Sequence, residues 1–269
     1  MKQVLFVLFL GLVFCSCQKK QDTIIKMDTS LGEIRILLYD ETILHKENIL
    51  KLVREGYYDG MLFHRVIKDF MIQTGDPDSR TATPGQALGE GDIGYTLKAE
   101  IIDKYFHKRG VLAAARQGND KNPERNSSGS HFYLVQGKKF SEDQLTAFVD
   151  KINQIRYASI MNNLEASRMN EIMVYRNAKD TASVAALERI YSELETKGRQ
   201  EYDKIKMILT PEKKEAYTTI GGAPHLDGEY TVFGEVIEGM EVVDKICLVP
   251  VDENDRPTEN VVIKEMTIE

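Results

Sequence analysis

The sequence contains two kinds of region, one with a residue pattern typical of strands and turns and one with a pattern typical of helices. This division limits the folds that the chain can adopt. Residues 23–137 and 218–269 consist of short apolar runs separated by Gly-, Asn- and Ser-rich loops, which is the pattern of strands joined by turns. Residues 138–217 contain one glycine, Gly198, and no proline before Pro211. Because residues that break helices are almost absent there, this block is predicted to be helical. We therefore expect a mostly β domain with a helical insertion.

The strand-like runs are numerous and short, which favours a barrel. A hairpin is expected first, since 24–29 and 32–39 are close neighbours and Ile34, Ile36 and Leu38 share one face. An amphipathic helix is expected over 47–55. The remaining strand-like runs are 62–67, 70–74, 111–115, 132–135, 230–237, 242–246 and 261–268.

The helical block carries its own start signals. Ser141 with Gln144 is typical of a capping box, and Thr210 followed by Pro211 is a favourable start for a short helix. Thr181 is a candidate cap for a helix between these two. Apolar residues then recur at helical spacing. The first such stripe is Leu145, Phe148, Val149 and Ile152. We expect a helical hairpin.

Residues 63–76, FHRVIKDFMIQTGD, place a cation and several apolar side chains on two strands joined by a turn. This segment closely resembles the active-site strand of cyclophilin-type peptidyl-prolyl cis/trans isomerases. The resemblance implies that Arg65 is the catalytic cation, that Gln73 donates on the carbonyl side of the substrate, and that Phe70 and Met71 form part of a proline pocket. Without the resemblance, Arg65 would be an exposed strand charge and Phe70 a core residue.

Four further segments resemble the same family: 52–60 (LVREGYYDG), 110–116 (GVLAAAR), 128–135 (SGSHFYLV) and 225–234 (HLDGEYTVFG). They imply a closed eight-stranded β-barrel with flanking short helices, covering nearly all of 23–137 and 218–269. The resemblance does not cover the insertion at 138–217. It places these residues along the bound peptide or in the pocket: Ala115, Arg116, Gln117, Tyr133, His225, Leu226 and Tyr230.

Three of these positions depart from the best-known family members. His225 stands where those members carry a tryptophan that contacts cyclosporin, and Tyr230 stands where they carry a histidine. Arg116 replaces a usual asparagine in the groove. We expect weak cyclosporin binding, and the preference for residues beside proline stays open.

Other chemistries find little support in the sequence. The formal charge of -7 and the lack of a basic, aromatic-rich run make nucleic acid an unlikely partner. The five histidines show no metal-ligand spacing, so neither a metal nor a cofactor is expected. His64 is expected to orient its strand through a hydrogen bond within the barrel.

The first residues indicate export. An apolar run at 4–14 after Lys2 is typical of a signal peptide, predicted over 1–16. Cys17 follows the small residue Ser16, which resembles the lipobox of bacterial lipoproteins, so Cys17 is the predicted lipidation site and 17–22 the tether. Cys15 fits this role less well, and both cysteines could instead be incidental. A lipidated Cys17 would leave Cys247 without a partner for a disulfide within the chain.

Together these features predict a peptidyl-prolyl isomerase in the cell envelope, anchored by lipid to a bacterial membrane, facing the periplasm and acting on proline-containing, exported clients. A binding module, in which the insertion holds clients and the barrel is passive, is the alternative. The insertion could dock clients or neighbouring subunits, or it could be a structural arm. If it only docks clients, deleting 141–216 should spare turnover of short peptides. The oligomeric state is left open.

Overall fold

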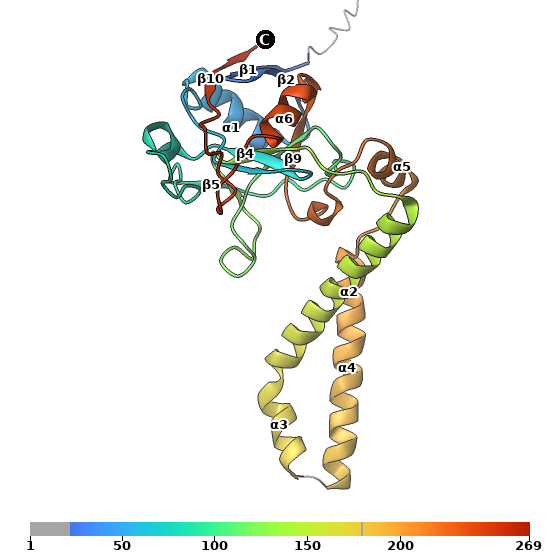
Figure 1. Ribbon diagram of the computed structural model, residues 1–269. Helices are drawn as coiled ribbons and strands as arrows, with labels where there is room; N and C mark the ends of the chain where they lie inside the picture. Colours follow the sequence, from blue (N-terminus) through green and yellow to red (C-terminus); the bar gives the residue numbers. More distant parts are fainter. Residues whose placement is uncertain (1–21, 179) are drawn as a thin grey trace, which may run out of the picture.

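The computed structural model describes residues 22–178 and 180–269, so the predicted signal peptide and Cys17 lie outside the described residues. An antiparallel sheet of eight strands forms the body of the domain (Figure 1). In spatial order its strands are β10 (Ile263–Ile268), β1 (Ile24–Thr29), β2 (Gly32–Leu38), β9 (Val232–Glu238), β6 (Val111–Ala114), β8 (Phe132–Val135), β4 (Met71–Thr74) and β3 (Arg65–Ile67). The short strands β5 (Thr96–Leu97) and β7 (Ser127–Ser128) pair separately.

The predicted strand number is confirmed for this sheet, but the prediction of a closed barrel was wrong. The sheet is open, and β3 and β10 are its edges. An isolated bridge between Leu62 and Val262 and a hydrogen bond from the Phe63 N–H to the Val261 carbonyl connect the two edges. The segment from α6 to β10 contains Pro250 and Pro257, which cannot donate to a ladder, so no continuous strand closes the gap.

The prediction of a mostly β chain was also wrong, because more of the described residues lie in helices than in strands. Within the sheet domain lie α1 (Ile43–Arg54), α6 (Met240–Cys247) and the 3-10 turns η1 (Pro77–Thr81) and η2 (Pro224–Leu226). The expected strand at 242–246 is part of α6. Its buried residues are Val242, Val243, Ile246 and Cys247, which is helical spacing despite the β-branched side chains.

The two faces of the central strands have different roles. Along β8, Phe132 and Leu134 belong to the main core, whereas Tyr133 and Val135 belong to a second cluster on the opposite face. Because side chains alternate along a strand, both faces of β8 are buried. α1 and α6 pack on the main-core face. The second cluster, on the other face, contains residues predicted to bind substrate.

Four helices form the insertion between β8 and β9: α2 (Glu142–Ser167), α3 (Met169–Ala178), α4 (Thr181–Ile205) and α5 (Pro211–Thr219). Figure 1 shows α2, α3 and α4 extending away from the sheet as an arm, whereas α5 lies near the sheet. The capping box at Ser141 and the cap at Thr210 are confirmed. The prediction that Thr181 caps α4 was wrong, because Asp180 is the cap and its carboxylate accepts the hydrogen bond from the Ser183 N–H.

The insertion has two separate apolar clusters. The base cluster, near the sheet, includes Phe106, Leu145, Val149 and Tyr217. The far cluster, along the arm, is built on Leu164, Ile172, Ile190 and Leu194. α2 and α4 pack together along the arm. Over the described part of the chain, no helix combines the length and the apolar character needed to cross a membrane.

Candidate active site

The strand register aligns three of the predicted site residues across the sheet. Arg65 on β3 lies opposite Gln73 on β4, and Gln73 lies opposite Tyr133 on β8. Residues directly opposite in an antiparallel pair point to the same face, so these side chains form one row. Met71 lies two residues before Gln73 and therefore shares that face.

A turn between β3 and β4 adds Phe70 to this row. Asp69 adopts a left-handed conformation, with φ of 61°, and its N–H donates to the Gln136 side chain at 2.7 Å. The Phe70 N–H donates to the Ile67 carbonyl, and the Phe70 carbonyl accepts from the N–H groups of Gln136 and Gly137. These bonds fix the backbone of Phe70 beside Met71.

A pocket of about 180 Å³ opens on this face of the sheet. Its lining is mixed: apolar side chains and tyrosine rings lie beside the polar ends of Arg65, Gln73 and Arg116. Tyr133 and Leu226 are buried, whereas Phe70 and Tyr230 are half-buried. The structure thus gathers nine of the predicted residues around one cavity: Arg65, Phe70, Met71, Gln73, Ala115, Arg116, Tyr133, Leu226 and Tyr230.

Arg65 keeps its guanidinium accessible. Its side chain is 43% exposed, and its Nε lies 3.7 Å from a carboxylate oxygen of Asp255, which is exposed to a similar extent. Exposed ion pairs of this kind contribute little free energy. The guanidinium can therefore exchange this partner for a ligand at small cost.

Arg116, in contrast, is held in place by the protein. Its side chain is 5% exposed and forms an ion pair with Glu229 at 3.1 Å. Its Nε donates to the Glu229 carbonyl, and its guanidinium stacks over the Tyr230 ring at 4.6 Å from the centroid. Arg116 therefore shapes the pocket by fixing Tyr230 rather than presenting a free charge.

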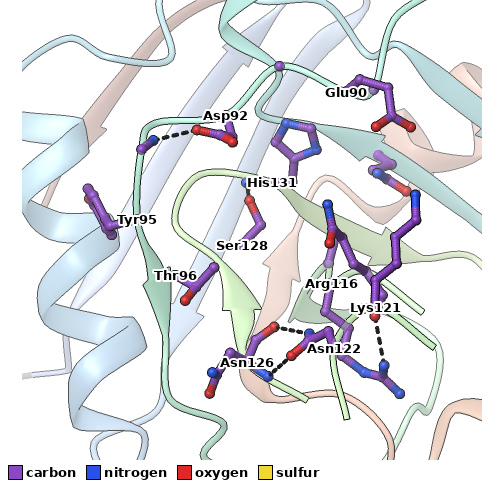
Figure 2. Close-up of a pocket in the computed structure, with 16 residues that line it drawn as sticks. Glu90, Asp92, Tyr95, Thr96, Arg116, Lys121, Asn122, Asn126, Ser128 and His131 are labelled. Atoms are coloured by element: carbon purple, nitrogen blue, oxygen red, sulfur yellow. Dashed lines mark hydrogen bonds between the residues drawn. The ribbon is translucent and has the colours of Figure 1, made fainter. Parts of the chain in front are cut away.

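Two predicted residues lie outside this pocket. Gln117 is exposed and lines a wider neighbouring cavity of about 620 Å³. Exposed His225 packs against the Phe70 ring, with 5.1 Å between the ring centroids. The wider cavity shares Gln73, Ala115 and Arg116 with the pocket, so the two form a continuous groove. Figure 2 shows the mixed polar lining of the wider cavity, with Glu90 and Asp92 at one end and Asn122 and Asn126 at the other.

A buried polar network below the pocket was not predicted from the sequence. The hydroxyl of Tyr133 contacts His107 Nε2 at 2.9 Å, and His107 Nδ1 lies 3.2 Å from Asp227 Oδ1. The hydroxyl of Tyr217 donates to the same carboxylate oxygen at 2.8 Å. Burial would raise the pKa of Asp227, but His107 and Lys213 outweigh that effect and hold the pKa below its ordinary value. No local motif could reveal this network, because its members are far apart in sequence.

The expectation for His64 was wrong. Both of its ring nitrogens are buried, and neither has a hydrogen-bond partner among the described residues. The ring lies 5.3 Å from the His131 ring, centroid to centroid. Burial, with a smaller contribution from His131, lowers the pKa of His64 to about 4. Within residues 22–178 and 180–269, no three His, Cys, Asp or Glu side chains are grouped to hold a metal ion.

Comparison with known proteins gives a consistent assignment. The family model described as cyclophilin type peptidyl-prolyl cis-trans isomerase/CLD matches residues 24–174 and 212–268. A Staphylococcus haemolyticus protein named as a peptidyl-prolyl cis-trans isomerase is 31% identical over 252 residues, covering 93% of each chain. A bifunctional phosphatase/peptidyl-prolyl cis-trans isomerase of Streptococcus pyogenes is 29% identical, and the match spans 91% of this chain but 38% of that protein.

A solved structure supports the same fold. The cyclophilin type peptidyl-prolyl cis-trans isomerase of Cryptosporidium parvum superposes with a TM-score of 0.54, at 20% identity, over 93% of this chain and 98% of that one. The family match covers both halves of the sheet domain and includes every residue around the pocket. The chain therefore belongs to the cyclophilin-type peptidyl-prolyl cis-trans isomerase family and is a peptidyl-prolyl isomerase.

Proposed function

We propose that the pocket holds the proline ring of a client while Arg65 and Gln73 stabilise the twisted amide. Rotation about a peptide bond has a barrier of about 18 to 20 kcal/mol, because the nitrogen lone pair is delocalised into the carbonyl. When the bond twists, the nitrogen regains that lone pair and becomes a hydrogen-bond acceptor. A site that donates to this nitrogen binds the transition state better than either planar isomer.

The main support for this proposal is that Arg65 and Gln73 lie opposite each other in the sheet and line the same small pocket as several apolar side chains. Phe70, Met71 and Leu226 offer an apolar surface for a proline ring. In this proposal Arg65 donates to the amide nitrogen and Gln73 donates to the substrate carbonyl. The residues beside proline would lie in the wider cavity beyond Ala115. No covalent bond is broken, so the reaction requires no nucleophile.

Substitution of Arg65 tests this mechanism. Arg65→Ala should lower kcat on a short X-Pro peptide by about a hundredfold, because a preorganised donor to the transition state is lost. Arg65→Lys keeps the charge but not the planar fork, so it should restore only part of the rate. Arg199→Ala, which changes a 68% exposed arginine on the arm, is the matched control. An unchanged rate for Arg65→Ala would refute the mechanism.

We also propose that the protein is a lipoprotein acting on exported clients at a membrane surface. The apolar run at 4–14 and the cysteine at position 17 support this. β1 begins at Ile24, seven residues after Cys17, so a lipid at Cys17 would keep the domain within about 25 Å of the bilayer. Labelling cells with a fatty-acid probe tests the anchor: Cys17→Ala should abolish the label and Cys15→Ala should not. Full labelling of the Cys17 variant would contradict it.

The far end of the insertion is our proposed contact for unfolded clients. Met173, Val174 and Val184 are 45%, 65% and 50% exposed there, and methionine adapts to varied apolar partners. Replacing Met173 and Val174 by serine should leave the turnover of short peptides unchanged and reduce catalysis of proline-limited refolding of a protein. Equal rates on the protein substrate would contradict this role. A passive binding module would instead show no turnover of short peptides.

A further inference from the structure

We propose that the base of the insertion is part of the active site's positioning machinery, and that Tyr217, Arg156 and Phe148 hold three walls of the proline pocket in place. This inference rests on the proposed assignment of that pocket as the site of isomerisation. It goes beyond client docking, because it concerns the pocket itself.

The first connection runs from α5 to Tyr133. Asp227 is 4% exposed, directly follows the pocket residue Leu226, and carries a buried charge. Its carboxylate accepts from the Tyr217 hydroxyl at 2.8 Å and pairs with Lys213 at 3.3 Å, and both partners belong to the insertion. A buried carboxylate that loses a partner is strongly destabilised. Asp227, and with it Leu226, is therefore fixed in position by α5.

The same carboxylate positions the pocket floor. Asp227 Oδ1 accepts from the His107 backbone N–H at 2.8 Å and also contacts the His107 ring. The other ring nitrogen of His107 contacts the Tyr133 hydroxyl at 2.9 Å. A continuous buried chain of polar contacts therefore leads from Tyr217 to a side chain that lines the pocket.

The second connection runs from α2 to Tyr230. Arg156 donates to the Asp227 carbonyl at 2.9 Å and lies 3.4 Å from Glu229 Oε1. The other oxygen of the Glu229 carboxylate pairs with Arg116, whose guanidinium stacks on Tyr230. Arg156 thereby anchors both the backbone of the pocket loop and the carboxylate that orients Arg116.

The third connection runs from α2 to Phe70 through aromatic rings. The Phe148 ring lies 6.2 Å from the His225 ring in an edge-to-face arrangement, and the His225 ring lies 5.1 Å from that of Phe70. Phe148 itself packs against the base cluster. The three connections end on different walls of one pocket, and each begins on a helix of the insertion. Deleting 141–216 should therefore impair turnover of short peptides, contrary to the expectation from a purely docking role.

Point substitutions test the proposal without removing the insertion. Tyr217→Phe deletes one hydroxyl, and Phe148→Leu keeps an apolar side chain but loses the ring contact with His225. Each should lower kcat/KM on a short X-Pro peptide by about tenfold, since small displacements of a catalytic site are costly. Each should also shift the methyl NMR signals of Leu226 and Met71 in the full-length protein. If a variant keeps its packing but displaces the pocket residues, kcat should fall by a larger factor than KM rises.

Tyr191→Phe is the matched control, because it makes the same chemical change in the arm, where the Tyr191 hydroxyl bonds Glu165 at 3.3 Å. It should leave both the rate and the two methyl signals unchanged. Rates within twofold of wild type and unmoved methyl signals in both Tyr217→Phe and Phe148→Leu would overturn the proposal. An unchanged rate in Arg65→Ala would instead refute the catalytic mechanism, while the methyl signals would still decide the positioning role.

Discussion

Lowering the pH from 8 to 5 should cost this protein about 2 kcal/mol of unfolding free energy through His64 alone. The pKa of the buried His64 ring is about 4 in the folded state, compared with 6.5 for a free side chain. The unfolded chain therefore binds a proton more readily than the folded one. The contribution of His64 to stability is complete above pH 6.5 and is lost as the pH falls toward 4. Burial also lowers the pKa of His131, so this residue should likewise reduce the free energy of unfolding as the pH falls.

The substitution His64→Leu isolates this effect. Both ring nitrogens of His64 lack a partner among the described residues, so removing them should not lower stability at pH 8. Urea unfolding of both proteins at pH 8, 6.5 and 5 gives the assay. The wild type should lose about 2 kcal/mol more than the variant between pH 8 and pH 5. An equal loss in the two proteins would show that His64 is not buried as a neutral base.

Three further outcomes follow from the structure. Gly75→Ala should destabilise the protein by more than about 3 kcal/mol in urea unfolding, because φ is +99° and a Cβ would lie 2.1 Å from the Ser130 carbonyl oxygen. Gly60→Ala is the control, because Gly60 has a φ of +78° but open space around it, and this substitution should cost about 1 kcal/mol. Similar costs at both sites would contradict a steric role for Gly75. Ser141→Ala should remove the capping box and cost about 1 kcal/mol, measurable by thermal unfolding, and no loss would argue against a formed cap in solution. Cyclosporin should bind weakly in calorimetry, given His225 and Tyr230; tight binding would show that these departures do not matter.

The features that could be predicted from the sequence are those that local chemistry determines. The cap at Ser141 depends on residues three positions apart, and the hairpin of β1 and β2 depends on alternation and a short turn. Segment 63–76 was assigned to the site through its resemblance to the cyclophilin family, and its two strands are neighbours in both sequence and space. The register then places Arg65 opposite Gln73.

The features that could not be predicted depend on distant parts of the chain. The β-branched residues at 242–246 favour a strand locally, but burial against the sheet selects a helix. Closure of the barrel depends on whether the segment after α6 can form a ladder. The Asp227 network joins residues as far apart as His107 and Tyr217, so no periodicity signals it. His64 is similar, because whether a buried histidine finds a partner depends on its neighbours in space.

The location of the bound proline ring distinguishes the smaller pocket from the wider cavity as the site of isomerisation. A short X-Pro peptide can be studied by NMR under conditions where the protein accelerates its cis/trans exchange, with nuclear Overhauser contacts measured between the proline ring and protein methyl groups. We expect contacts from the ring to the methyl groups of Met71 and Leu226, which line the smaller pocket. Accelerated exchange with the proline ring in contact only with residues of the wider cavity, such as Thr96, would contradict it.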